Sequence, residues 1–243
     1  MKGVILAGGS GTRLHPLTRI TNKHLLPLYD RPMVTYAIEA LVDAGVTELM
    51  LVTGGTHAGE FFRLLGNGHD YGIDRLLYAY QERPGGIAEA LGLAERFVSR
   101  DKACVMLADN IFEESLRPIV ENFDAQDRGG RIVLSRVAEA EHLRHLGVAV
   151  MGDDSRVTKI IEKPDEPPSE FAVTGVYFYD AQVWDVLPEL EPSGRGELEI
   201  TDVNNWYVGR GEMEADVVGG FWGDAGESID AYYEVNDFVR RRA

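Results

Sequence analysis

The stretch "VILAGGSGTR" (Val4–Arg13) joins a short apolar run to a glycine-rich turn that ends in an arginine. The run Val4–Ala7 has the length and composition of a buried β-strand. Glycines in the turn allow backbone N–H groups to approach phosphate oxygens closely. From Met1 to Tyr29 the chain has four lysines and arginines and no aspartate or glutamate, although the formal net charge of the whole chain is −16. This local positive charge indicates a site for a small anion.

The turn does not match the two best-known phosphate-binding loops. It lacks the Gly-Lys-Ser/Thr ending of a Walker A loop, and Leu14 stands where a G-x-G-x-x-G motif has its third glycine. An ordinary tight turn would explain the glycines but not the nearby Arg13 and Lys23. Arginine offers a planar fork for two phosphate oxygens, and lysine is a point charge on a flexible stem. Together they suit a triphosphate whose α-phosphorus is attacked.

Strand-length apolar runs recur after this turn, and segments with apolar residues at helical spacing separate them. Such alternation predicts an α/β fold with a mostly parallel central sheet flanked by helices, whose ligands bind beyond the carboxyl ends of the strands. The predicted strands are Val4–Ala7, Leu49–Thr53, Leu76–Tyr80, Ala103–Ala108 and Ile132–Val137, and the predicted helices are Met33–Ala44, Thr56–Leu65, Ile87–Phe97 and Leu116–Phe123.

The pattern changes from about Leu146 to closely spaced β-like segments, which predict a lobe set against the sheet. The turn Gly152–Ser155 is expected to close a hairpin between the first two of these segments. We find no linker, so residues 1–243 are expected to form one domain, with parts at about 1–137 and 138–243. The later segments are strands Val148–Met151, Val157–Glu162 and Ala172–Tyr179 and helices Ala181–Leu187, Glu199–Val208 and Ser228–Arg242.

Composition narrows the class of protein. The 243 residues are 44% hydrophobic and 26% charged, typical of a globular chain, and no apolar run approaches a membrane span. The excess of 40 acidic over 24 basic residues argues against a broad nucleic-acid surface. The apolar run at the amino terminus is too short for a signal peptide, so we expect a cytoplasmic protein. The single Cys104 has apolar neighbours and is expected to be a buried strand thiol.

Seven ordered motifs resemble those of the sugar-1-phosphate nucleotidylyltransferases, and together they narrow the resemblance to the glucose-1-phosphate thymidylyltransferase branch. The resemblance implies a Rossmann-like, mixed central sheet with a small β-rich sugar-binding lobe, the nucleotide-diphospho-sugar transferase fold. It extends from Met1 to about Asn236, and the chain lacks the carboxy-terminal extension, roughly 50 residues, of longer members. The motifs are "LAGGSGTRLHPLT…NKHLLP" from Leu6, "GGIAEAL" from Gly85, "ADNIF" from Ala108, "IIEKP" from Ile160, "AVTGVYFYD" from Ala172, "RGELEITDVNNWY" from Arg195 and "WGDAG" from Trp222.

The resemblance implies that the phosphate oxygen of α-D-glucose 1-phosphate attacks the α-phosphorus of dTTP, giving dTDP-glucose and pyrophosphate. This chemistry requires positioning, charge neutralisation and a divalent cation. Asp109 and Asp224 match the aspartates that hold Mg²⁺, and hard carboxylate oxygens suit that ion. Arg13, Lys23 and Lys163 match the catalytic cations. The implied nucleotide-binding residues are Leu6, Gly8, Gly9, Gly11, Thr12, Arg13, Gln81 and Gly86.

The sugar phosphate is expected to meet a second set of residues. Lys163 would hold the phosphate, and Pro164 is expected to force an extended bend that aims it. Glu162 would accept hydrogen bonds from sugar hydroxyls, whereas Glu199 is expected to serve the local fold. The implied sugar-phosphate-binding residues are Asn110, Gly147, Glu162, Lys163, Val173 and Arg195.

Three departures from the family pattern leave alternatives open. Ala108 replaces a glycine beside Asp109, Leu146 replaces an aromatic residue, and Glu227 replaces a threonine. UTP could be used beside dTTP, because a methyl group changes binding by only about 1–3 kcal/mol. Another sugar phosphate, or a sensor that binds nucleotide sugars without turnover, is also compatible with these residues. The resemblance further implies a homo-oligomer, either a dimer or a tetramer.

Overall fold

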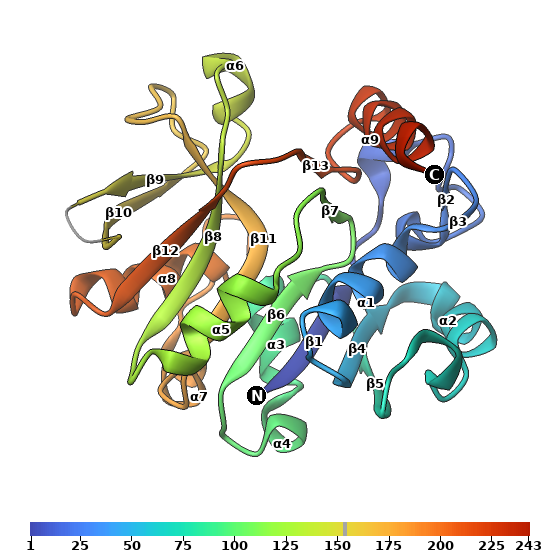
Figure 1. Cartoon of the computed structure of the whole chain (residues 1–243), viewed down its shortest axis with the longest axis horizontal. Helices are drawn as coiled ribbons and strands as arrows, with labels where there is room; N and C mark the ends of the chain where they lie inside the picture. Colours follow the sequence, from blue (N-terminus) through green and yellow to red (C-terminus); the bar gives the residue numbers. More distant parts are fainter. Residues whose placement is uncertain (153–154) are drawn as a thin grey trace.

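The computed structural model describes residues 1–152 and 155–243. The predicted Gly152–Ser155 turn contains residues 153 and 154, which lie outside these ranges. Within them, a nine-stranded sheet has the order β10-β9-β11-β6-β1-β4-β5, with β8 paired to β11 and β12 paired to β8 (Figure 1). Its strands are β1 (Lys2–Ala7), β4 (Glu48–Gly54), β5 (Arg75–Gln81), β6 (Ala103–Leu107), β8 (Gly130–Arg136), β9 (Gly147–Met151), β10 (Val157–Glu162), β11 (Phe171–Tyr179) and β12 (Met213–Val218).

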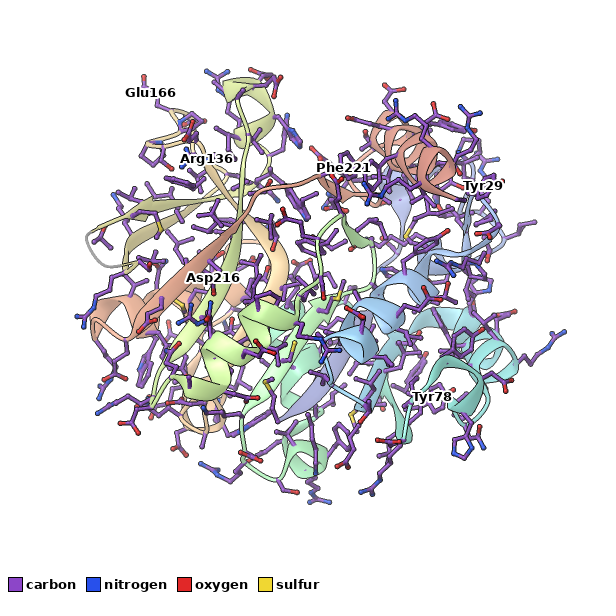
Figure 2. The ribbon with its side chains drawn as sticks, viewed as in Figure 1. Tyr29, Tyr78, Arg136, Glu166, Asp216 and Phe221 are labelled. Atoms are coloured by element: carbon purple, nitrogen blue, oxygen red, sulfur yellow. The ribbon has the colours of Figure 1, made fainter. Side chains whose placement is uncertain are left out.

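The predicted fold class is confirmed, since β6, β1, β4 and β5 run parallel and helices cover the sheet. The predicted β-rich lobe is continuous with this sheet, because β11 pairs antiparallel with both β6 and β8. Strand β12 was missed because Glu214 and Asp216 interrupt its apolar pattern. Both carboxylates form ion pairs with Arg131 of the neighbouring strand β8, and the Asp216 contact measures 2.6 Å. Figure 2 shows Asp216 and Tyr78, from the edge strand β5, on opposite sides of the molecule.

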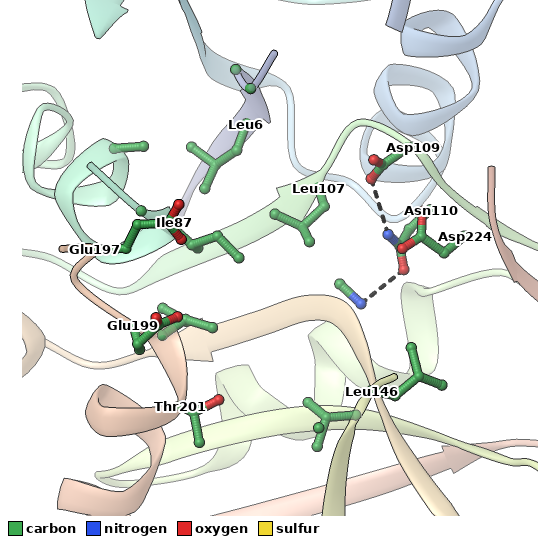
Figure 3. A pocket seen from close by; sticks show the side chains of 18 of the residues that line it. Leu6, Ile87, Leu107, Asp109, Asn110, Leu146, Glu197, Glu199, Thr201 and Asp224 are labelled. Carbon is green, nitrogen blue, oxygen red and sulfur yellow. Dashed lines mark hydrogen bonds between the residues drawn. The ribbon is translucent and has the colours of Figure 1, made fainter. Parts of the chain in front are cut away.

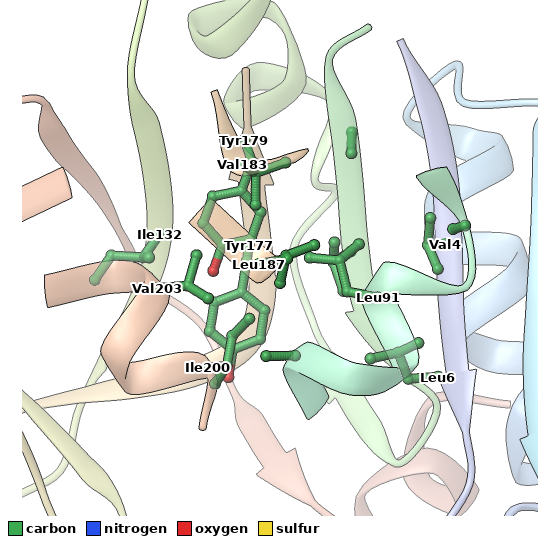
Figure 4. Packing of buried hydrophobic residues seen from close by; sticks show 14 of the residues in the cluster. Val4, Leu6, Leu91, Ile132, Tyr177, Tyr179, Val183, Leu187, Ile200 and Val203 are labelled. Carbon is green, nitrogen blue, oxygen red and sulfur yellow. The ribbon is translucent and has the colours of Figure 1, made fainter. Parts of the chain in front are cut away.

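Side chains alternate between two hydrophobic clusters, one on each face of the sheet, because successive strand residues point in opposite directions. Ile5 of β1 packs in one cluster, with α1 (Met33–Asp43), α2 (Ala58–Leu65) and α5 (Arg117–Ala125). Leu6 packs in the other (Figure 4). The helices of that second cluster are α3 (Ile87–Gly92), α4 (Glu95–Val98), α7 (Val183–Val186) and α8 (Ile200–Gly209).

Most predicted elements are present with shifted ends. The single helix predicted over Ile87–Phe97 is two helices, α3 and α4, because the poor helix former Gly92 ends the first. Cys104 is fully buried in β6, as predicted. No helix in the described part of the chain is long and apolar enough to cross a bilayer.

A short antiparallel pair, β7 (Asn110–Phe112) and β13 (Trp222–Asp224), joins distant parts of the chain. Helix α9 (Ile229–Arg242) follows β13 and lies beside β2 (Pro27–Leu28) and β3 (Arg31–Pro32) in Figure 1. Its Tyr232 packs in a third cluster with residues of the amino-terminal loop. The carboxy-terminal segment is therefore held against the glycine-rich turn region.

Candidate functional site

A cavity of about 320 Å³ opens at the carboxyl ends of β1, β5 and β6, the edge where a parallel sheet binds ligands (Figure 3). It brings together most of the predicted site residues. Gly11 and Thr12 are the exceptions, since neither lines the cavity. The predicted residues that line it are Leu6, Gly8, Gly9, Arg13, Lys23, Gln81, Gly86, Asp109, Asn110, Gly147, Glu162, Lys163, Val173, Arg195 and Asp224.

The glycine-rich turn forms one wall of this cavity. Gly9 and Gly11 have φ values of 96° and 63°, in the region that favours glycine. The carbonyl of Gly11 accepts a hydrogen bond of 2.7 Å from the Thr18 hydroxyl, which holds the turn in shape. Gly11 therefore shapes the loop from behind, while Gly8, Gly9 and Arg13 face the cavity.

The β7–β13 pair brings the two predicted metal-binding aspartates together. Asp224 lies opposite Asn110 in the register, and the backbone N–H of Ala225 donates to the Asp109 carbonyl at 2.9 Å. Gly226 is required here, because a Cβ at that position would lie 2.3 Å from Asp109 Oδ2 and 2.7 Å from Lys23 Nζ. The structure thus places both carboxylates and Lys23 at the same end of the cavity.

The electrostatics of these three groups are linked. Lys23 Nζ donates to Asp109 Oδ2. Burial alone would lower the Lys23 pKa, but the charges of Asp109 and Asp224 outweigh it and the pKa is raised. Burial would raise the Asp109 pKa, yet Lys23 holds it well below its ordinary value. Burial and then the Asp109 charge raise the pKa of Asp224 to about 7. One lysine therefore does not neutralise both carboxylates.

His24 was not predicted and lies beside this cluster. Its Nε2 is 3.7 Å from Asp109 Oδ2, and burial lowers its pKa, so the imidazole is neutral at pH 7. Asn22 Oδ1 accepts from the His24 backbone N–H and lies 2.9 Å from Nδ1 of the ring. The polar run Asn22–His24 could have indicated this histidine, but only Lys23 was predicted from it.

The side chain of Asn110 forms three hydrogen bonds within the protein. Its Nδ2 donates to Asp109 Oδ1 at 3.2 Å (Figure 3). Its Oδ1 accepts from Gly175 N at 2.8 Å and from Trp222 Nε1 at 2.7 Å. These contacts orient Asp109 and connect β7, β11 and β13. We predicted Asn110 as a ligand of the sugar phosphate; in the structure this side chain also positions the aspartate.

The opposite wall carries the predicted sugar-phosphate residues. Glu162 Oε2 accepts a 2.9 Å hydrogen bond from Thr201, and Lys163 Nζ lies 3.7 Å from Glu162 Oε1. The expectation that Pro164 holds an extended bend is wrong, because Lys163 has a φ of 46°. Its N–H donates to the Leu146 carbonyl at 3.0 Å, which holds the residue in this strained conformation.

Arg195 lines the same side but is already paired. Its Nη2 donates to both oxygens of Glu199 at 2.9 Å, which fits the local role predicted for that glutamate. Half of the Arg195 side chain is exposed, so the guanidinium still reaches the cavity. A phosphate there would compete with Glu199 for it.

Two of the three residues that depart from the family pattern lie outside the cavity lining. Ala108 is fully buried among core residues, and its N–H donates to the Leu6 carbonyl at 3.0 Å. Glu227 points to His142, with 2.8 Å between the Oε2 and Nε2 atoms. Leu146 does line the cavity, so it is the departure that touches the predicted sugar side.

The His142–Glu227 pair predicts a pH dependence of stability. The hydrogen bond that His142 donates to Glu227 raises the pKa of His142 against the effect of burial, and the charges of Glu227, Glu139 and Glu234 add to it. Because the pKa of His142 is raised in the folded state, the pair contributes its full stabilisation of the fold below about pH 6.5, the ordinary histidine pKa. This stabilisation is lost as the pH rises through the raised pKa. The contribution should stay below about 1 kcal/mol, because the imidazole is 40% exposed. The free energy of unfolding, measured in urea, should therefore fall less between about pH 5.5 and about pH 8.5 in Glu227→Gln than in wild type. An equal fall in the two proteins would contradict this prediction.

A second prediction concerns Gly86, which has a φ of 97°. A Cβ there would lie 2.3 Å from the Leu198 carbonyl oxygen, so the glycine is needed for close backbone packing as well as for the cavity. Gly86→Ala is expected to lower the free energy of unfolding by about 1–3 kcal/mol. Gly92→Ala, at the end of helix α3 that Gly86 precedes and with open space around it, is the control and should be neutral or stabilising. Equal stability of the two variants in urea unfolding would refute the packing argument.

Known proteins resemble this chain along nearly its whole length. The family model described as nucleotidyl transferase matches residues 2–242. A glucose-1-phosphate thymidylyltransferase from Neisseria meningitidis serogroup A is 41% identical over 243 residues, covering 99% of this chain and 83% of that protein. A solved structure from Bacillus anthracis, assigned as a glucose-1-phosphate thymidylyltransferase and in complex with sucrose, has a TM-score of 0.92 and 44% identity, covering 99% of this chain and 95% of that one. A UDP-glucose pyrophosphorylase complexed with UDP-glucose shares the fold, with a TM-score of 0.84 at 23% identity, covering 100% of this chain and 99% of that one.

Proposed function

The chain belongs to the nucleotidyl transferase family, and from this premise we propose that it joins dTTP to α-D-glucose 1-phosphate, releasing pyrophosphate and leaving dTDP-glucose. The observation that carries the proposal is one cavity with cations on both walls, Arg13 and Lys23 on one side and Lys163 on the other, and with Asp109 and Asp224 at one end. Two anionic reactants need this arrangement, because they repel each other unless cations hold them together.

The residues divide the chemical work. The glycine turn and Arg13 would bind the triphosphate, and Lys163 would hold the sugar phosphate so that its oxygen attacks the α-phosphorus in line. Negative charge moves onto the departing pyrophosphate during the step. Lys23 would stabilise that charge, since its ammonium is kept protonated by the neighbouring carboxylates. Catalysis then depends on positioning and charge, with no covalent intermediate on the protein.

The acidic end of the cavity fits a divalent cation, and we propose Mg²⁺. Asp109 and Asp224 supply hard oxygen donors, and the pKa of Asp224 near 7 shows that their charges are only partly neutralised by Lys23. Mg²⁺ bound there would neutralise phosphate charge in the transition state. Asn110 and Gly226 would keep the two carboxylates in place, through the Asn110 contact with Asp109 and the Gly226 N–H that donates to Asp224 at 2.8 Å.

We also propose a domain organisation, a cellular location and an oligomeric state. The sheet crosses the predicted boundary near residue 137, which supports one catalytic domain. A cytoplasmic enzyme that forms a dimer or tetramer stays our prediction. The sensor without turnover loses its motivation, since Ala108 and Glu227 do not crowd the cavity.

A substrate panel tests the proposal. Purified protein is assayed for pyrophosphate release with Mg²⁺, using dTTP or UTP and glucose 1-phosphate or another hexose 1-phosphate. We expect the highest kcat/KM with dTTP and glucose 1-phosphate, with UTP lower by no more than about 200-fold, and complete loss of release when a chelator removes the metal. Pyrophosphate release that continues after chelation would contradict the metal assignment. No release with any pair of nucleotide and sugar phosphate would contradict the proposed reaction.

A further inference from the structure

Glu89, in the first turn of α3, contacts Gln81, one of the predicted nucleotide-binding residues. Its Oε1 accepts a hydrogen bond of 3.0 Å from Gln81 Nε2, and the same Nε2 donates to the Gly86 carbonyl at 3.2 Å. Gln81 is 8% exposed and lines the cavity. The NH₂ group of the amide is therefore held by two acceptors of the protein.

The Glu89 carboxylate occupies the space beside Gly85 that a side chain at that position would fill. A Cβ on the buried Gly85 would lie 2.1 Å from the Glu89 carboxyl carbon and from both of its oxygens. On its solvent side, Oε2 is 3.3 Å from Arg83 Nη2, and 23% of the Glu89 side chain is exposed. Any side chain at position 85 would displace the carboxylate, so the glycine and the glutamate form one structural unit.

The partners of Gln81 determine which end of its amide faces the cavity. A primary amide has a donor end and an acceptor end, whereas a carboxylate and a backbone carbonyl only accept. Both Glu89 and Gly86 therefore draw the NH₂ group toward themselves. The carbonyl Oε1 must point the other way, toward Gly8, where a Cβ would be 3.2 Å from it.

We propose that Glu89 is a positioning residue that sets base selection by fixing the orientation of the Gln81 amide. The inference rests on the proposed function with dTTP, and it takes Gln81, a predicted nucleotide-binding residue, as the one that would face the pyrimidine base. With only an acceptor offered to the ring, the site selects bases with a ring N–H there. Thymine and uracil have N3–H, whereas cytosine has a bare nitrogen that would face an oxygen lone pair. A mismatch of this kind leaves a buried acceptor unpaired and is rejected strongly.

The test compares dTTP with dCTP in wild type, Glu89→Gln and Glu89→Ala. A glutamine can donate as well as accept, so it lets the Gln81 amide turn; alanine removes the partner altogether. We expect the ratio of kcat/KM for dTTP over dCTP to fall about tenfold or more in both variants, through KM more than kcat. The ratio of dissociation constants, measured by calorimetry without the sugar phosphate, should fall by the same factor.

Two controls separate this role from general damage. Glu95→Gln changes a glutamate that pairs with Arg100 at 3.1 Å outside the cavity, and it should keep the wild-type ratio. Gly85→Ala, which displaces the Glu89 carboxylate, should lower the ratio as Glu89→Gln does. An unchanged ratio in Glu89→Gln, or an equal loss with both nucleotides, overturns the proposal. If wild type releases no pyrophosphate, the proposed function fails, while the binding ratio still decides the role of Glu89.

Discussion

Asp109→Asn is expected to lower the rate of pyrophosphate release by about a thousandfold or more, because several kcal/mol of transition-state charge stabilisation depend on this carboxylate and each 1.36 kcal/mol is a factor of ten. The substitution keeps the shape of the side chain but removes the charge that Lys23 contacts. Lys23 then loses the main group that raises its pKa, and Asp224 loses the charge that helps to raise its own. The Mg²⁺ concentration at half-maximal rate should rise sharply.

The control is Asp185→Asn, which removes a carboxylate that is 74% exposed and pairs with Arg100 away from the cavity. It should leave the rate and the Mg²⁺ dependence unchanged. Unfolding curves of both variants show whether Asp109→Asn folds, since breaking a buried ion pair costs about 3–5 kcal/mol. A folded Asp109→Asn protein with near wild-type release would remove Asp109 from the catalytic site.

Lys163→Ala is expected to lower kcat/KM for glucose 1-phosphate by about a hundredfold, because a hydrogen bond to a charged group contributes about 1.5–3 kcal/mol. Affinity for dTTP alone should change little, since Lys163 lies on the wall opposite the glycine turn. The measurement is steady-state kinetics in each substrate, with dTTP binding followed separately by calorimetry. A loss in dTTP affinity equal to the loss with sugar phosphate would contradict the assignment.

The strained backbone at Lys163 supplies an independent check. Lys163→Gly loses the same ammonium group but accommodates the positive φ, so it should be about 1 kcal/mol more stable than Lys163→Ala while being equally impaired in kcat/KM. Lys159→Ala, which changes an exposed lysine of β10 outside the cavity, just before Lys163 in the chain, is the matched control for loss of positive charge. Equal stabilities of the glycine and alanine variants would mean that position 163 is not strained.

The sequence alone predicted the fold class, and most of the site residues that it named line the cavity. Strand-length apolar runs separated by amphipathic helices indicated a parallel α/β sheet, and its carboxyl edge indicated where Gln81 and Asp109 would lie. Local physics decides such features: glycine frees the turn after β1, and apolar alternation buries both faces of the strands. Strand β12 was missed because Glu214 and Asp216 interrupt its apolar pattern, and their ion-pair partner Arg131 lies 83 and 85 positions away in the sequence.

Only the tertiary structure decided how these residues act together. The pairing of β7 with β13 is what brings Asp224 to Asp109, and burial beside that charge is what raises the Asp224 pKa to about 7. The orientation of the Gln81 amide likewise depends on a carboxylate eight residues away that fits only because Gly85 has no side chain. Sequence determines which side chains are present and the local shape of the chain, because these depend on neighbouring residues. Distances, burial and hydrogen-bond partners set their chemistry, because charge interactions and desolvation act through space.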